Sequence, residues 1–358
     1  MSINFSAFEI GRRALNSNQF GIDITGQNIA NVNTPGYSRQ RVQLAETPPN
    51  NYSKFSVGTG VSVVGVQSFR DNFIQSRIQN ETGIAGRLSA KRDSLAPVET
   101  VLQGGENGGL QNALSSFFGS FRDLEANPNS LPLRSVVAQK GANLANSFRA
   151  TSTKLNEINI GIDSQIRSTV TQVNSLSQKT AELNGQIRSI EAAGNDASAL
   201  RDLRDETINK LSEMTGARST ENSDGTITLT IGEGRPLVTG DKPYLLGVQS
   251  TPPLGLAAIT IDGQPAVFEG GTIAGLQDAI TETTSQLNAL DGLAAAVVQR
   301  VNDLHSSGTD LDGNQGTNFF NNSQPVTSAN IAINPAITGN PRLVVASPVT
   351  QPGQSGTI

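Results

Sequence analysis

Several short stretches of this sequence carry residue types that could do chemistry. Asp310, Asp312 and Asn314 have the alternate spacing of a calcium-binding loop, in which oxygen ligands recur at every second position. Gln315 stands where such a loop has glycine, and Asn321 stands where it has glutamate. The pattern therefore departs twice from the residue types that the loop needs. It favours an Asp-Gly turn without a metal ion.

Three other stretches are equally weak as catalytic or binding motifs. Residues 104–109 are rich in glycine, but no Lys-Ser/Thr pair follows, so we expect a linker and no phosphate loop. His305 is the only histidine, and its place in the last turn of an expected helix suits the helix dipole. The acidic cluster 202–206 is expected on a solvated helix face, with Arg201 and Asp205 forming an exposed pair one turn apart. These residues predict no catalytic site, no cofactor and no metal site.

The composition excludes further classes of function. The chain has 358 residues and no cysteine, which excludes disulfides, thiolate zinc sites and cysteine nucleophiles. Its formal net charge of −5 comes without a basic run, which argues against a nucleic-acid partner. No stretch approaches the roughly 20 apolar residues of a membrane span, and the N-terminus lacks the features of a cleaved signal peptide. We expect no membrane insertion.

One long helix, expected from residue 133 to about residue 193, organises the chain. Its apolar residues recur in steps of three, four and seven, which is the narrow seam of a coiled coil. At 1.5 Å per residue it would reach roughly 90 Å, so its thin apolar stripe needs partner helices. A return helix that begins at residue 272 is the natural partner. The expected seam consists of Leu144, Phe148, Leu155, Ile158, Ile162, Val173, Leu176, Leu183, Ile187, Leu290, Val297 and Val301.

Residues 3–30 form a second amphipathic pattern, with Phe8, Leu15, Ile22 and Ile29 spaced seven apart. One apolar residue in every two turns is too little to fold alone, so this stripe is expected to pack against helices, including those of other subunits. A helix on a membrane surface would carry more basic residues along its polar face than this one does. The pattern therefore predicts an assembly helix.

An asparagine-rich word follows this helix at residues 28–39. Its asparagines end the helix, and its Pro-Gly pair suits the centre of a type II turn. The residues that define it are Asn28, Asn31, Asn33, Pro35, Gly36 and Tyr37. This word resembles the N-terminal signature of the axial proteins of the bacterial flagellum, namely the rod, hook and hook-associated proteins.

A second set of words resembles the hook-associated branch of that family. They are Gly275-Leu276, Leu290-Asp291-x-Leu293-Ala294, Val301-Asn302-x-x-His305, Gly308-x-Asp310-x-x-Gly313-x-x-Gly316 and Phe319-Phe320. The resemblance implies a structural subunit, not an enzyme, which joins hook to filament and polymerises by helix packing. It also implies passage through the flagellar type III export apparatus without a cleaved signal, and a place outside the cell in the flagellum. The implied partners are further copies of the chain, the hook protein and the next junction protein.

The sequence departs from the family pattern at its C-terminal side. Family members carry a second long amphipathic helix that pairs with the N-terminal one and serves export-chaperone binding, and no such pattern follows Phe320. The helix at 3–30 is therefore expected to lack its partner helix within the chain, and its apolar stripe is expected to be exposed. Residues up to about Phe55 are expected to be mobile, and a chaperone site is in doubt.

The expected fold class is mainly α with a β insertion: a long coiled-coil-like helical bundle, a small antiparallel β subdomain and an N-terminal assembly helix. The period changes to two between residues 217 and 271, which predicts the β insertion, whereas residues 40–56 are expected to be an irregular loop. The expected divisions are 1–70 for the N-terminal axial segment, 71–216 for the bundle, 217–271 for the insertion, 272–320 for the return helix and 321–358 for an extended tail.

Three alternatives compete with this interpretation. Another axial subunit, rod or hook, would not need the long seam at 144–190. A secreted coiled-coil adhesin or binding module would explain the long helix and the β insertion, but it leaves the word at 28–39 unexplained. A wall-cleaving hydrolase needs clustered acids and usually aromatic sugar platforms, and this chain has no tryptophan.

Overall fold

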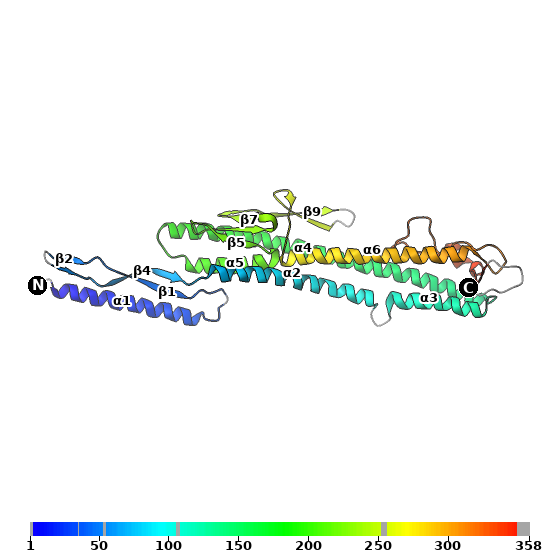
Figure 1. Cartoon of the computed structure of the whole chain (residues 1–358), viewed down its shortest axis with the longest axis horizontal. Helices are drawn as coiled ribbons and strands as arrows, with labels where there is room; N and C mark the ends of the chain where they lie inside the picture. Colours follow the sequence, from blue (N-terminus) through cyan, green and yellow to red (C-terminus); the bar gives the residue numbers. More distant parts are fainter. Residues whose placement is uncertain (1–2, 35, 53–54, 105–107, 252–255, 349–358) are drawn as a thin grey trace. The chain divides into compact units, whose positions relative to one another are not determined.

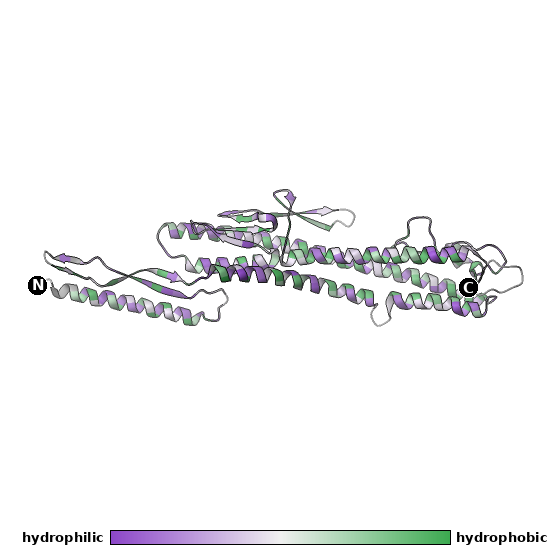
Figure 2. Ribbon diagram, viewed as in Figure 1, coloured by the Kyte–Doolittle hydropathy of each residue, from purple (hydrophilic) through white to green (hydrophobic). Residues whose placement is uncertain are grey.

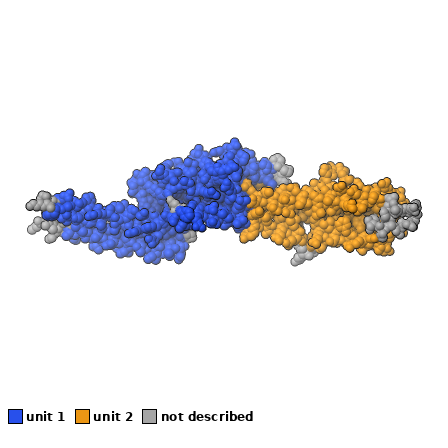
Figure 3. All heavy atoms as spheres, viewed as in Figure 1, with its two compact units in different colours: residues 1–89, 166–275 blue, residues 90–165, 276–358 orange. Residues whose placement is uncertain are grey.

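The computed structural model describes residues 3–34, 36–52, 55–104, 108–251 and 256–348. They form two compact units, which Figure 3 shows in different colours. Unit 1 takes residues 1–89 and 166–275, and unit 2 takes residues 90–165 and 276–358. Each unit thus combines segments that lie far apart in the sequence. The five-segment division of the chain stays a prediction.

Helix α4, Leu131–Ala192, is the organising helix and contributes to both units (Figure 1). It begins within two residues of the predicted start, with Pro132 in its first turn, where the missing N–H costs nothing. It ends just before Gly194, whose φ of 78° lies in the left-handed region that glycine adopts easily. The prediction of one exceptionally long helix is confirmed.

The predicted seam of this helix is mostly, but not evenly, buried. Of its α4 members, Ile158 and Leu176 are only half-buried, and the polar neighbours Asn159 and Ser177 are fully buried in their place. A repeat of seven residues does not fit the 3.6-residue turn of a helix exactly, so the apolar stripe turns slowly around the helix axis. At some turns the residue next to the stripe therefore faces the neighbouring helices instead. The buried members are Leu144, Phe148, Leu155, Ile162, Val173, Leu183 and Ile187.

In unit 2, α4 packs with α3, Gly109–Ala126, and with parts of α2, Asn72–Gln103, and α6, Gly271–Ser306. Leu290 and Val301 of α6 are buried as expected, whereas Val297 is half-buried beside the buried Val298. The core also includes the C-terminal segment, which contains β12, Gly308–Thr309, α7, Pro335–Gly339, η3, Pro341–Leu343, and β13, Ser347–Pro348.

An aromatic cluster closes this core. The ring of Phe117 on α3 lies 5.5 Å from that of Phe319 and 5.7 Å from that of Phe320, measured between centroids. All three side chains are fully buried. Gly141 on α4 leaves room for them, because a Cβ atom there would lie 2.5 Å from the ring of Phe319. These three phenylalanines therefore belong to the core of unit 2.

Unit 1 begins with α1, Ile3–Ala30, which packs on a ribbon of two strands, β1, Gln40–Glu46, and β4, Val61–Ser68. Two shorter strands, β2, Asn50–Tyr52, and β3, Phe55–Val57, pair with each other. The prediction of an irregular loop over residues 40–56 was wrong. A bulge between Gln43 and Leu44 interrupts the alternation of apolar residues that would have revealed the strand.

The β insertion of unit 1 consists of two antiparallel sheets. The first has the order β5-β6-β7-β8, formed by Arg218–Glu221, Ile227–Ile231, Arg235–Thr239 and Lys242–Pro243, with η2, Gly232–Gly234, before β7. The second has the order β11-β10-β9, formed by Gln264–Pro265, Leu256–Ile261 and Leu246–Thr251. The predicted fold class, mainly α with an antiparallel β insertion, is confirmed.

Two asparagines of α4 hold these sheets through backbone groups. Asn184 donates to the carbonyl oxygens of Ile227 and Gly240 and accepts from the Ile227 amide. Asn174 exchanges two hydrogen bonds with Leu246, at 2.9 and 2.8 Å. The polar positions of the long helix thus attach the β insertion, while its apolar positions form the core.

Glycines permit a close crossing between α2 and α5, Ser198–Thr215. A Cβ atom at Gly86 would lie 2.3 Å from the carbonyl oxygen of Glu213, and one at Gly83 would lie 3.2 Å from the Cα of Gly216. Gly216 itself ends α5 with a φ of 68°. The crossing holds the first half of α2 against α5 in unit 1.

Candidate functional site

Helix α1 presents two lines of residues with sevenfold spacing on different faces. Ser17 and Ile24 are 6% and 7% exposed and lie on the face that packs against the β1–β4 ribbon. Ile10 continues this line and contacts Gly60, the residue before β4. This face of α1 is therefore covered by a strand pair that the bulge hides in the sequence, and not by a second helix.

The second line is the stripe that the sequence singled out. Phe8, Leu15, Ile22 and Ile29 are 64% to 71% exposed. Figure 2 shows hydrophobic and hydrophilic residues interspersed along this helix. A Cβ atom added at Gly11, three residues after Phe8, would meet nothing within 4 Å, so the space beside the large side chains is open. Large and small residues alternating along a free helical face suit interdigitation with another helix.

The asparagine-rich word forms a closed turn at the end of α1. Asn28 accepts from the hydroxyl of Tyr37 and from the amide of Gln40, both at 2.9 Å, and donates to the Gln40 carbonyl at 2.8 Å. The Tyr37 amide donates to the Thr34 carbonyl, and Gly36 has a φ of 82°, as the third position of a type II turn requires.

Two further members of the word have lesser roles in the described structure. Asn31 accepts a hydrogen bond from the hydroxyl of Thr34, and Asn33 is exposed. Pro35 lies outside the described residues. The word therefore works mainly through Asn28, which fixes the path of the chain from α1 into β1.

Arg70 and Asp202 connect this turn to α5. The Asp202 carboxylate accepts from the Ser38 amide at 3.3 Å and from the Arg70 guanidinium at 2.5 Å. Arg70 also donates to the Ser38 hydroxyl and lies 3.5 Å from the Asp205 carboxylate. The turn, the start of α2 and α5 thus meet in one network of charge-assisted hydrogen bonds.

The expectation of a solvated acidic face on α5 was wrong. Arg201 binds Glu191 and Glu221 and does not pair with Asp205. Asp202 and Asp205 lie three residues apart on one face, which turns toward Arg70. Burial raises the pKa of Asp205 above its usual value, against the opposing effect of Arg70. An amphipathic helix with a charged buried face gives no apolar signal in the sequence.

Beside this network lies a polar cavity of about 310 Å³ with Arg204 in its wall. Arg204 is 1% exposed and donates to the Asn184 side chain and to the Gly225 carbonyl. Burial lowers the pKa of Arg204 to about 10, so the guanidinium stays charged at neutral pH. The cavity holds no nucleophile paired with a base, and the described residues contain no group of histidines and acids that could bind a metal.

The motifs of unit 2 that could have done chemistry are structural. Asp310 accepts from the amides of Asp312 and Asn314, at 2.8 and 2.9 Å, which is the predicted Asp-Gly turn. His305 lies in the last turn of α6, as expected, and its ring is 4% exposed and hydrogen-bonded to backbone groups, a burial that the sequence did not reveal. The glycine-rich stretch 104–109 falls partly outside the described residues.

No helix in the described ranges has the length and apolar character that a membrane span requires. The candidate functional site is the junction of α1, the asparagine-rich turn and α5, where side chains from these three elements form hydrogen bonds and ion pairs. Its chemistry is that of positioning, because Asn28, Arg70 and Asp202 each bind another part of the same unit.

Two protein-family models match this chain, each over a different range of residues. Residues 95–320 match the family model of the flagellar hook-associated protein FlgK helical domain, and residues 8–37 match that of the flagella basal body rod protein. The second match ends at Tyr37, the last residue of the closed turn. The words at 28–37 and at 275–320 therefore lie within the two matched regions.

Similar whole sequences come from several bacteria. The chain is 31% identical to flagellar hook-associated protein 1 of Bacillus subtilis, over 89% of this chain and 71% of that protein. It is 29% identical to the protein of that name from Salmonella typhimurium, over 88% of this chain and 59% of the relative. The Escherichia coli protein of that name is 26% identical, and the match covers 60% of it.

A solved structure has a similar fold. The flagellar hook junction protein FlgK from Burkholderia pseudomallei superposes with a TM-score of 0.61 over 70% of this chain and 46% of that protein, at 24% identity. The chain thus spans under two thirds of that structure and of the enterobacterial relatives, and somewhat more of the Bacillus one.

Proposed function

Because the chain belongs to the family of flagellar hook-associated protein 1, we propose that it is a structural subunit of the bacterial flagellum that joins hook to filament. The observation that supports this most is the exposed stripe of α1. Four large apolar side chains with strict sevenfold spacing stay open to solvent although the opposite face of the helix is covered. Such a stripe suits a partner helix in an assembly.

The partners that we propose are further copies of this chain, the hook protein and the next junction protein of the flagellum. The turn at Asn28 and the Arg70–Asp202 network serve this role because they fix the C-terminal end of α1 to β1 and α5 within unit 1. We further propose that the chain reaches the cell exterior through the flagellar type III export apparatus, and that it has no catalytic activity.

The stripe can be tested by co-sedimentation of the full chain with purified hook polymer. Leu15→Ser and Ile22→Ser each remove a large apolar side chain that is more than 60% exposed. We expect at least a tenfold loss of binding and little change in the free energy of unfolding, because surface substitutions rarely change it by more than about 0.5 kcal/mol.

Phe20→Ser is the matched control, since Phe20 lies on the same helix, is 39% exposed and falls outside the sevenfold stripe. Unchanged binding in this variant is expected. Equal loss in all three variants would mean that the stripe has no special role, and unchanged binding in the two stripe variants would contradict the proposed assembly face.

A further inference from the structure

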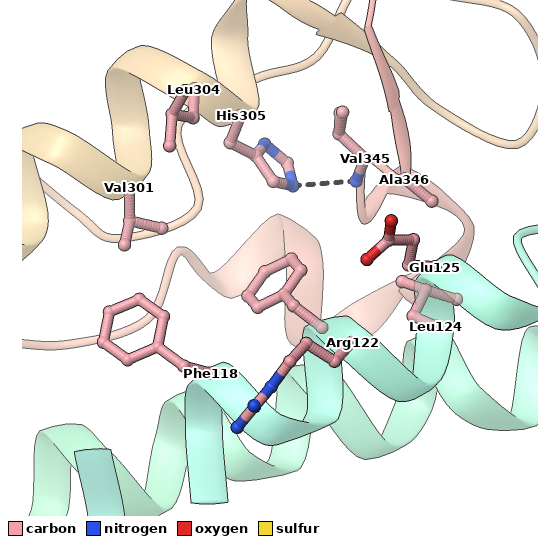
Figure 4. A pocket seen from close by; sticks show the side chains of 10 residues that line it. Phe118, Arg122, Leu124, Glu125, Val301, Leu304, His305, Val345 and Ala346 are labelled. Atoms are coloured by element: carbon pink, nitrogen blue, oxygen red, sulfur yellow. Dashed lines mark hydrogen bonds between the residues drawn. The ribbon is translucent and has the colours of Figure 1, made fainter. Parts of the chain in front are cut away.

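Unit 2 contains an apolar cavity of about 170 Å³ to which the proposed function assigns no role (Figure 4). Helix α3 and the last turns of α6 form most of its wall. The remaining wall is a short piece of the C-terminal segment, residues 344–346, which we call the strap. Val345 and Ala346 of the strap line the cavity directly.

The strap is held by the imidazole of His305. The Val345 amide donates to Nε2 at 3.0 Å, as the dashed line in Figure 4 shows, and Nδ1 lies within hydrogen-bond distance of the Thr317 carbonyl oxygen. Because an N–H group faces Nε2, this nitrogen must offer its lone pair, and the proton sits on Nδ1. The closed strap therefore requires a neutral ring.

The charges around His305 oppose its protonation. Burial lowers the pKa of His305 below its usual value, and the Arg134 guanidinium of α4 adds to this effect, while the bond to Thr317 acts against it. Arg134 is itself 3% exposed and donates to the Val344 carbonyl, so a cation already lies against the strap.

The other charged groups nearby are occupied or lie at the cavity wall. Asp310 accepts hydrogen bonds within its own turn, and Asp312 forms an exposed ion pair with Arg342. Arg122 and Glu125 of α3 line the same cavity, one of each sign. None of these groups is placed within a hydrogen bond of the imidazole in the described structure, so the ring gains no carboxylate partner when it is protonated.

We propose that His305 is a pH-sensitive latch, which holds the strap over the apolar cavity and releases it when the ring takes up a second proton. One proton from solvent binds Nε2 and converts the acceptor of the Val345 amide into a donor. Two donors then face each other, and the new cation lies near Arg134. The strap leaves, and the apolar side chains of α3 and α6 that it covers become accessible.

Hydrogen exchange of the full chain tests this latch, with fragments that resolve residues 343–346. After correction for the intrinsic rate, opening of the strap should become about tenfold more favourable per pH unit as the pH falls below about 6.5, since one proton is taken up. The same segment should show constant protection between pH 7 and pH 8.

His305→Gln is the discriminating variant. Glutamine can donate to the Thr317 carbonyl and accept from the Val345 amide, but it does not titrate. We expect its strap to stay equally protected from pH 8 to pH 5.5. His305 is the only histidine of the chain, so no second imidazole contributes to the wild-type response.

A wild-type strap whose protection does not depend on pH would overturn the proposal, as would an equal pH response in the glutamine variant. If circular dichroism shows that the variant does not fold, an NMR titration of the single imidazole in the wild-type chain decides instead. A ring pKa at or above 6.5 would then exclude a latch that needs the neutral form.

Discussion

Arg70 is the residue through which the asparagine-rich turn contacts α5. It binds Asp202 and Ser38 and lies near Asp205, and its side chain is only 18% exposed. Arg70→Met should lower the free energy of unfolding by about 2 kcal/mol, because it leaves two half-buried carboxylates without their cation. Urea denaturation measures this loss.

Lys210→Met is the control for that substitution, since Lys210 also pairs with an acid of α5 but is more than half exposed. Exposed pairs of this kind contribute about 0.3–0.5 kcal/mol. Equal losses in the two variants would mean that the Arg70 network is no more than a surface ion pair.

The sequence reveals the turn but not its partners. Asn28, Gly36 and Tyr37 lie in one short word, and their residue types already predict a helix end followed by a turn. Arg70 and Asp202 are 132 residues apart, and neither spacing nor hydropathy relates them. His305 shows the same limit, because a buried imidazole that binds only backbone groups has no sequence partner to identify it.

Among the elements, the crossing of α2 and α5 depends on the absence of a side chain at Gly86. Gly86→Ala should destabilise the chain by about 1–3 kcal/mol, because its Cβ would meet the backbone of Glu213 at 2.3 Å and force the helices apart. Thermal unfolding followed by circular dichroism measures the change.

Gly161→Ala is the matched control, because Gly161 lies inside α4 and has nothing within 4 Å of a Cβ position. This substitution should stabilise the helix by about 0.5–1 kcal/mol through backbone propensity alone. If Gly86→Ala also stabilised the chain, the close crossing of the two helices would be contradicted.

The long helices could be predicted because their periodicity extends over many turns, so local irregularities do not hide it. The β1–β4 ribbon could not, since a single bulge shifts the alternation within strands of seven and eight residues. The charged face of α5 was misassigned for a related reason. A hydropathy scale gives a charged residue the same value whether its ion pair is buried or exposed to solvent. Burial removes both charges from water and strengthens their attraction, so a buried pair and an exposed pair differ in energy.

At the scale of the whole molecule, exposed apolar side chains are concentrated in the first quarter of the chain. Most of those in the described residues lie between Phe8 and Leu88, on α1, the β ribbon and the first half of α2. The cores of the helical bundle and of the β insertion are well covered by comparison. This division suggests that the N-terminal part acquires its full stability only in an assembly.

Limited proteolysis of the isolated chain tests whether the N-terminal part is less stable than the helical bundle. A helix packed on a two-stranded ribbon is marginally stable by itself, because so few of its side chains are buried. Trypsin should therefore cut first at Arg12, Arg13, Arg39 and Arg41, and leave a fragment that begins at Val42 and keeps α4 and α6 intact. Mass spectrometry of the fragments identifies the cuts.

The same digestion in the presence of hook polymer tests whether the N-terminal part is cleaved early because its partner is missing. If the exposed stripe of α1 binds a partner helix, the cuts at Arg12 and Arg13 should slow at least tenfold, and Leu15→Ser should abolish this protection. Cleavage within α4 before any cut in residues 12–41 would contradict the expected order of stability. It would mean that the ribbon holds α1 more firmly than its few buried side chains indicate, and that the N-terminal part is folded before it meets its partners.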